Sequence, residues 1–288
     1  MSPDLKDVLN FMAMCFESNN LGYSAMNTIR SALSTFICID DKPVGSHPLI
    51  VRFLRGIFVL KPALPRNICT WDTSVVLQFL KTLSPVNQLN LKELTFKTVT
   101  LTALLTSQRC QSLGLIDIRN IKISKFKVKI AFGDLLKQTR PGYQLEELTI
   151  HGFPPDRRLC IVKVMKEYLS RTVELRGDSK QLFITTKKPF RPASTQTISR
   201  WVKTTLKLAG VDMEMFTPHS VRAASASNAR QMNIPLKTIM KTAGWSNKCT
   251  FTRFYNKKVK KSGVVSQCLL NKTIDSNEKL APCSDSSN

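Results

Sequence analysis

The stretch Thr217-Pro-His-Ser-Val-Arg222 carries the most specific structural signal in this sequence. Thr217 is a preferred N-cap residue and Pro218 a preferred first helical residue, so a helix is predicted to begin here. His219 and Arg222 then share one helix face beside the positive end of the helix dipole. A histidine donor, an arginine fork and a helix N-terminus directed at one point form an anion site. A capped helix with a surface arginine is the alternative reading.

Two aromatic signals follow this helix. In Ala243-Gly-Trp-Ser246, the glycine is typical of a helix end and the serine of the next N-cap. Phe251-Thr-Arg-Phe-Tyr255 lies on the next predicted helix, over residues 247–259. Taken singly, Trp245 and Tyr255 are more typical of core residues than of a functional site.

Two basic residues of interest lie upstream. Arg109 sits in 104–113, which is predicted to be a largely apolar helix, where a single arginine usually extends its charged end into water. Lys137 follows the clearest predicted strand, Lys125-Phe-Lys-Val-Lys-Ile130, in which apolar and basic residues alternate. It also precedes a Pro-Gly turn, and a lone lysine in such a place is usually only solvated.

The order and spacing of these groups resemble the tyrosine recombinase (phage integrase) family. The shared segments are Ser107-Gln-Arg-Cys-Gln-Ser-Leu113, Leu136-Lys-Gln-Thr-Arg-Pro-Gly142, His219-Ser-Val-Arg-Ala-Ala-Ser225 and Ala243-Gly-Trp-Ser246, followed by Tyr255. Within the family, the chain looks closest to the recombinases of DIRS-like retrotransposons of animals. It departs from the usual pattern at Trp245, where histidine is more common.

The resemblance implies a DNA recombinase that breaks and rejoins DNA through a 3′-phosphotyrosyl intermediate, for the integration or recombination of a mobile element. The implied site residues are the phosphate-binding Arg109, Arg222, His219 and Trp245, the general acid Lys137 and the nucleophile Tyr255. His219 can also accept the phenol proton. Because a phenol has a pKa of about 10, well below that of an alcohol, a DNA hydroxyl can reverse the phosphotyrosine. The chemistry therefore implies no metal ion, no ATP and no other cofactor.

The predicted fold class is mainly α with a small β-sheet (α+β). The chain divides into a helical DNA-clamping domain over 1–62, a tyrosine recombinase catalytic domain over 65–260 and a C-terminal tail over 261–288. The first domain is shorter than is usual in the family, which suggests truncation at the N-terminus. Weaker strands are predicted at 147–150 and 182–184, and one or two further apolar helical turns within 91–115. The other helices of the second domain are predicted at 72–83, 159–172, 195–209, 218–232, 235–242 and 247–259.

The charge of the chain indicates a polyanionic partner. The sequence has 43 Lys and Arg against 20 Asp and Glu, a net charge of +23. Residues 215–274 contain no acidic residue, whereas solvated surfaces normally mix both signs. Double-stranded DNA is the expected partner. The basic run Lys257-Lys-Val-Lys-Lys261 is typical of a nuclear localisation signal or of a segment that binds phosphate. The expected location is the nucleus.

Several classes of protein are disfavoured. No apolar run approaches the roughly 18 residues that cross a bilayer, and the N-terminus does not resemble a secretory signal, so no membrane partner is expected. The 8 cysteines and 3 histidines lack the spacing of a zinc site or a disulfide framework.

Three alternatives to the recombinase remain open. A two-metal nuclease or transposase needs converging carboxylates, which the stretch around His219 and Arg222 does not supply. A catalytically silent, transposon-derived DNA-binding protein should lack one of the six groups. A type IB topoisomerase shares the chemistry, and only its products differ. The recombinase is expected to act as a homo-oligomer, a tetramer on DNA, with the apolar segment Val264-Val-Ser-Gln-Cys-Leu-Leu270 docking on a neighbouring protomer.

Overall fold

The computed structural model describes residues 3–62, 69–137 and 139–260. The chain forms two compact units, 1–66 and 67–288, and nearly all of its excess positive charge belongs to the second unit. The predicted tail over 261–288, with its apolar segment, lies outside the described residues. Within the described ranges, no helix combines the length and the apolar character that a membrane span requires.

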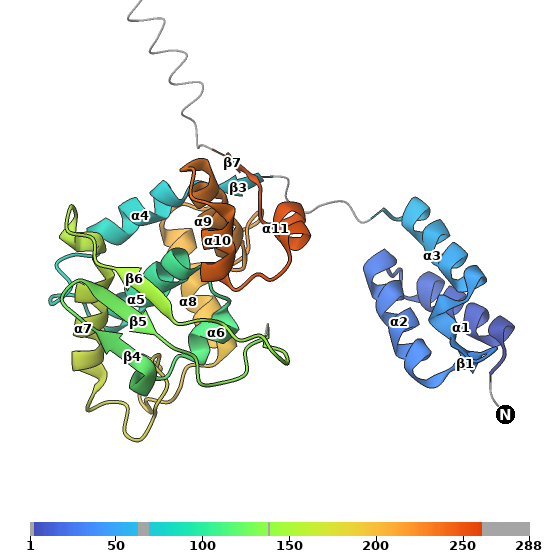
Figure 1. Ribbon diagram of the computed structural model, residues 1–288, viewed down its shortest axis with the longest axis horizontal. Helices are drawn as coiled ribbons and strands as arrows, with labels where there is room; N and C mark the ends of the chain where they lie inside the picture. The colour runs from blue at the N-terminus through green and yellow to red at the C-terminus, as the bar shows by residue number, and fades with distance from the viewer. Residues whose placement is uncertain (1–2, 63–68, 138, 261–288) are drawn as a thin grey trace, which may run out of the picture. The chain divides into compact units, whose positions relative to one another are not determined.

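Three helices and a hairpin make up the first unit (Figure 1). Its elements are α1 (Leu5–Ser18), α2 (Tyr23–Phe36), β1 (Cys38–Ile39), β2 (Lys42–Pro43), the 3₁₀ turn η1 (Val44–Ser46) and α3 (Pro48–Leu60). Met12, Met26 and Ile50 are fully buried between the helices and form the centre of a small core. The assignment of this unit as a DNA clamp stays a prediction.

The second unit is mainly helical. Its helices are α4 (Thr73–Thr82), α5 (Leu91–Thr106), α6 (Cys110–Gly114), α7 (Ile161–Thr172), α8 (Thr195–Leu208), α9 (Ser220–Gln231), α10 (Leu236–Ala243) and α11 (Lys248–Phe254), with 3₁₀ turns η2 (Ile118–Asn120) and η3 (Arg157–Leu159). Asp72 caps α4 by accepting a hydrogen bond from the backbone N–H of Ser74, as its sequence position predicts.

Helix α5 lies at the centre of the second unit and packs against α7, α8 and α9. Most of its residues are buried on all sides, although many of them are threonines. Thr98, Thr102 and Thr106 each donate a hydrogen bond to the carbonyl four residues earlier. Because these hydroxyls are satisfied within the helix itself, they can be buried at little cost.

A three-stranded antiparallel sheet packs beside these helices, in the order β4 (Ile121–Ile123), β5 (Lys127–Ile130) and β6 (Leu148–His151). Val128 pairs with Ile123 on one side and Ile150 on the other. Small sheets among many helices confirm the predicted fold class.

Two details of the predicted strands are wrong. The predicted strand over 125–130 begins two residues later, and Phe126 is 67% exposed because it lies in the turn that enters β5. The predicted strand at 182–184 is not an extended strand, because its pairing is limited to isolated bridges such as the one between Ile184 and Pro192.

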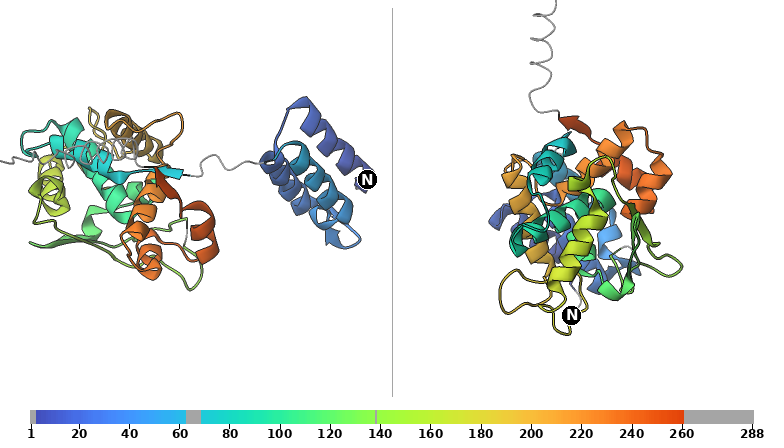
Figure 2. Two further views of the ribbon diagram at one scale, coloured as in Figure 1. Left: turned by 90° about the horizontal axis from the view of Figure 1, so that it is seen from above. Right: turned by 90° about the vertical axis from the view of Figure 1, so that its left-hand side faces the viewer.

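Helix α11 ends at Phe254, five residues before the predicted end at Val259. The chain then forms β7 (Lys258–Lys260), which pairs in parallel with β3 (Cys69–Trp71), so the two strands lie side by side (Figures 1 and 2). Part of the basic run that follows Tyr255 is therefore a strand, since β3 offers it a backbone to pair with.

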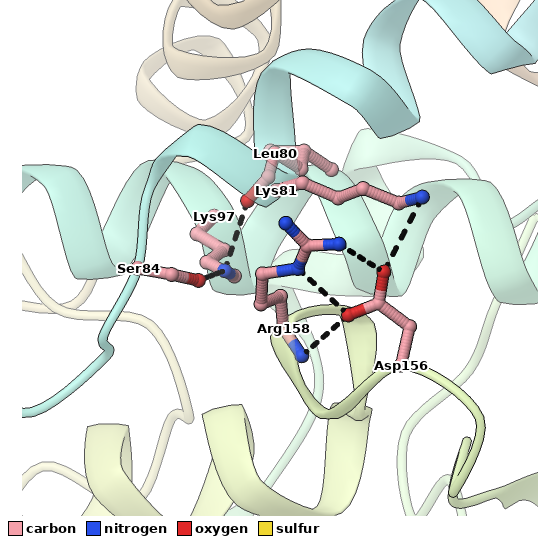
Figure 3. Close-up of polar contacts among 6 residues, drawn as sticks. All are labelled: Leu80, Lys81, Ser84, Lys97, Asp156 and Arg158. Atoms are coloured by element: carbon pink, nitrogen blue, oxygen red, sulfur yellow. Dashed lines mark hydrogen bonds and ion pairs between the residues drawn. The ribbon is translucent and has the colours of Figure 1, made fainter.

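A buried lysine connects α5 to the end of α4 (Figure 3). Lys97 is fully buried, and its ammonium donates hydrogen bonds to the carbonyls of Leu80 and Leu83 and to the Ser84 hydroxyl. Burial lowers the pKa of Lys97 to about 8. The two carbonyls lie at the C-terminal end of α4, where helix carbonyls lack partners within the helix.

We expect Lys97→Met to lower the free energy of unfolding by about 2 kcal/mol, because two buried carbonyls lose a charged donor. Urea unfolding at pH 7 measures this. Lys166→Met is the matched control, because Lys166 is exposed on α7. Equal stabilities of the two variants would show that the Lys97 ammonium makes no net contribution to the free energy of unfolding.

Candidate active site

The predicted anion site lies at the start of α9. The helix begins at Ser220, with His219 in the N-cap position, two residues after the predicted start at Pro218. The difference arises because Thr217, Pro218 and His219 accept hydrogen bonds from residues three positions later, which makes a tighter turn than an α-helix. His219 and Arg222 nevertheless come from the same first turn.

Arg222 is 1% exposed and joins three segments of the second unit. Its Nη1 donates to the carbonyl of Ser107 at 2.5 Å, and its Nη2 donates to the carbonyl of Ala243 at 3.2 Å. Its Nε is buried and has no hydrogen-bond partner among the described residues. Burial lowers the pKa of Arg222 to about 10, so the guanidinium is still charged at neutral pH.

Trp245 forms one wall of the site. It follows Gly244, whose φ of 69° is the left-handed conformation that the Gly-Trp sequence predicts at a helix end. Its ring lies 4.7 Å from the centre of the Arg222 guanidinium, within the range of a cation–π contact. The indole Nε1 is buried and lacks a hydrogen-bond partner among the described residues. Trp245 therefore presents an unused donor beside the guanidinium.

Tyr255 follows the end of α11 and completes this wall. Its ring centroid is 4.4 Å from that of Trp245, and its Oη is 3.3 Å from Nε2 of His219. The Tyr255 hydroxyl also acts on Arg222 and favours the charged guanidinium. A cavity of about 260 Å³ opens beside these groups, and its lining comprises Cys69, Thr70, Phe216, Thr217, His219, Ser220, Ala223, Tyr255 and Lys257.

Arg109 and Lys137 come from segments that precede α9 in the chain. The predicted helix over 104–113 is wrong: α5 ends at Thr106, Ser107 takes a left-handed conformation with φ of 52°, and Arg109 is the N-cap residue of α6. This break leaves Arg109 half-buried. Lys137 is exposed on the connection between β5 and β6.

The electrostatics place Arg109 and Lys137 at the same site as His219. Burial is the largest cause of a lowered His219 pKa, and the positive charges of Arg222, Arg109, Lys137 and Lys257 lower it further. His219 is therefore neutral at pH 7. The structure thus brings His219, Arg222, Trp245 and Tyr255 into contact, and the charges of Arg109 and Lys137 act on His219. This concentration of positive charge suits an anion, such as a phosphate.

We expect Arg109→Gln to raise the pKa of His219, because one repelling positive charge is removed. NMR titration of the imidazole signals measures this, and the chain has only 3 histidines to assign. Arg200→Gln, at an exposed position on α8, is the control and should leave the titration unchanged. An unshifted His219 in Arg109→Gln would place Arg109 outside the site.

Several supporting residues were missed by the sequence analysis. Ser225 donates to the carbonyl of Leu104 and hydrogen-bonds to the Ser107 hydroxyl at 2.9 Å, which ties α9 to the break before Arg109. Gln108 donates to the carbonyl of Thr242 at 2.7 Å. Ser107, Gln108 and Ser225 lie inside the segments that carry the family resemblance, but their partners are distant in sequence and only the fold reveals them.

Across the described ranges, no three His, Cys, Asp or Glu side chains lie close enough together to hold a metal ion.

Comparison with known proteins identifies the class of protein. The model of the phage integrase family matches residues 72–261, more than half of the chain. The chain belongs to this family of tyrosine recombinases, whose class of activity is site-specific DNA recombination. The family resemblance stated above is therefore confirmed at this level. A comparison with curated proteins found no match.

Solved structures with the same fold have low sequence identity to this chain. The XerH site-specific recombinase in a post-cleavage complex with its palindromic difH substrate has a TM-score of 0.59 at 14% identity, covering 96% of this chain and 73% of that chain. The Tn1549 transposon integrase in complex with transposon right end DNA has a TM-score of 0.57 at 14% identity, covering 95% and 86%. The lambda integrase dimer bound to a COC′ core site has a TM-score of 0.51 at 15% identity, covering 90% and 82%. These likenesses show the shared fold.

Proposed function

We propose that this protein breaks and rejoins DNA through a 3′-phosphotyrosyl intermediate on Tyr255, for the integration or recombination of a mobile element. The observation that carries the proposal is the position of the Tyr255 hydroxyl, 3.3 Å from His219 and beside the buried guanidinium of Arg222. A phenol in this position lies beside two buried donors, Nε of Arg222 and Nε1 of Trp245, that have no hydrogen-bond partner among the described residues. The resemblance to DIRS-like retrotransposon recombinases supports the mobile-element context.

The proposed reaction is an in-line displacement at phosphorus. Oη of Tyr255 forms a bond to phosphorus while the bond to the 5′ oxygen breaks, and His219, neutral at pH 7, accepts the phenol proton. Arg109, Arg222 and the indole N–H of Trp245 stabilise the charge on the non-bridging oxygens.

Lys137 supplies a proton to the leaving 5′ oxygen, so the cleaved strand carries a 3′-phosphotyrosine on one side of the break and a free 5′-hydroxyl on the other. Attack by a DNA hydroxyl reverses these steps and restores the phenol. In this scheme neither a metal ion nor ATP takes part.

The proposed partner is double-stranded DNA, and the proposed assembly is a homotetramer on two duplexes. The high positive charge supports the first part. The proposed tetramer is supported by a lambda integrase of similar fold, with a TM-score of 0.50, which forms a tetramer on a Holliday junction. The proposed location is the nucleus of a host cell, and the basic run over 257–261 supports this proposal.

The test is a nicked suicide duplex, which traps the enzyme because the cleaved fragment diffuses away. Wild-type protein should form a protein–DNA adduct that survives SDS, and the adduct should form equally well in excess EDTA. DNA binding without an adduct would indicate the silent DNA-binding protein instead, and an adduct that needs Mg²⁺ would contradict the metal-independent mechanism. Relaxation of supercoils without strand exchange would indicate a type IB topoisomerase.

A further inference from the structure

Helix α9 carries a second buried polar residue that contacts the segment around Tyr255. Ser227 is 1% exposed and lies five residues after Arg222. Its Oγ donates a hydrogen bond to the carbonyl of Tyr255 at 2.6 Å and accepts one from the backbone N–H of Lys257 at 3.0 Å. One hydroxyl therefore holds the backbone on both sides of Asn256.

These two hydrogen bonds occur where α11 has just ended. The N–H groups of Tyr255 and Asn256 still bond to the carbonyl of Phe251, but the chain then leaves the helix for β7. The carbonyl of Tyr255 consequently has no later helical N–H to accept from, and the N–H of Lys257 has left the helical ladder. The Ser227 hydroxyl satisfies both groups at once.

The same helix positions the phosphate-binding side of the site. Arg222 and Ser227 lie on α9, so one rigid element sets both the guanidinium and the backbone that carries the phenol. The side chain of Tyr255 has little freedom to compensate for a shift of its backbone, because its ring packs 4.4 Å from Trp245 and its hydroxyl must stay near His219. A displacement of about 1 Å in a reacting group can cost on the order of 100-fold in rate.

We propose that Ser227 is a positioning residue that fixes the nucleophile of this enzyme relative to the phosphate site. The inference rests on the proposed function of Tyr255. Ser227 does not touch the DNA or the reacting atoms in this scheme, and it acts only through the backbone of Tyr255 and Lys257.

The first test measures the rate of adduct formation on the nicked duplex at saturating DNA. Ser227→Ala should reduce this rate roughly 10- to 100-fold while the Kd for DNA stays within about twofold of wild type. Ser227→Thr keeps the hydroxyl and should recover most of the rate. Asn228→Ala is the matched control, because Asn228 lies next to Ser227 on α9 but donates to Thr73 and Asp72 instead; it should keep a near-wild-type rate.

The second test needs no catalysis. Hydrogen exchange of the Lys257 amide should accelerate at least about tenfold in Ser227→Ala and not in Asn228→Ala, because only the first variant removes its acceptor. If Ser227→Ala does not fold, Ser227→Cys, with a weaker donor and acceptor, serves in both tests.

Three results would overturn the inference. Two of them are a wild-type rate in Ser227→Ala and hydrogen exchange at Lys257 that does not respond to this substitution. Equal rate losses in Ser227→Ala and Asn228→Ala would also overturn it, because they would indicate general damage to α9. If wild-type protein forms no adduct at all, the proposed function fails, while the exchange measurement still decides whether Ser227 holds this backbone.

Discussion

Tyr255→Phe is expected to abolish the SDS-resistant adduct, with a loss on the order of 10⁴-fold or more in the rate of its formation. The substitution removes only the oxygen that bonds to phosphorus. The ring keeps its contacts with Trp245 and with the Arg222 guanidinium, whose centre lies 5.6 Å from the ring of Tyr255. The Kd for DNA should therefore stay within a fewfold of wild type, which separates a chemical defect from a binding defect.

The other tyrosines provide the controls for this result. Tyr168 is fully buried and its hydroxyl accepts a hydrogen bond from the N–H of Ile184, so it is not accessible to DNA. Tyr143 is half-buried on the connection that also carries Lys137, and it is the alternative nucleophile in the second unit. Tyr143→Phe should form the adduct normally. An adduct that persists in Tyr255→Phe, or one mapped by mass spectrometry to Tyr143, would show that another residue is the nucleophile.

The parts of the fold that sequence analysis predicted correctly depend on local signals. Asp72 caps α4 because its own side chain reaches an N–H two residues away, and Gly244 ends α10 because its conformation is unfavourable for other residues. Val128 and Ile130 are buried because a strand alternates its faces every residue. Such features are encoded within a few residues and do not require knowledge of the tertiary structure.

The parts that were missed depend on partners distant in sequence. A continuous helix over residues 247–259 is reasonable from the local pattern, but β3 pairs with β7 and the helix ends at Phe254. The helix over 104–113 breaks because Ser225 and Arg222 hold the backbone at Leu104 and Ser107. Tertiary hydrogen bonds override helix propensity in both places.

The candidate site shows the same division. The order of the six groups along the chain was enough to name them by family resemblance. The structure brings four of them into contact, namely His219, Arg222, Trp245 and Tyr255. The way Arg222 is held by two carbonyls, and the contact of Ser227 with the backbone of Tyr255, were not predictable, because a lone serine on a helix gives no sequence signal. Positioning groups of this kind become visible only when the fold is known.

The second large effect concerns Lys137, whose proposed role is to protonate the leaving 5′ oxygen. Lys137→Ala should slow adduct formation roughly 100-fold or more on ordinary DNA. A duplex with sulfur in place of the bridging 5′ oxygen should restore most of this loss, since a thiolate leaves without a proton: a thiol has a pKa of about 8.5, far below that of an alcohol. Single-turnover rates on the two substrates measure the rescue.

Arg222→Gln and Arg109→Gln are the comparison, because guanidiniums that stabilise the non-bridging oxygens are needed whichever atom leaves. Each should lose on the order of 100- to 1000-fold on both substrates, without rescue by sulfur. The burial of Arg222 makes Arg109→Gln the safer of the two for folding, because Arg109 is only half-buried. Equal defects of Lys137→Ala on oxygen and sulfur substrates would mean that Lys137 binds phosphate. The acid would then have to be sought among the other cations that act on His219, which include the lysine Lys257.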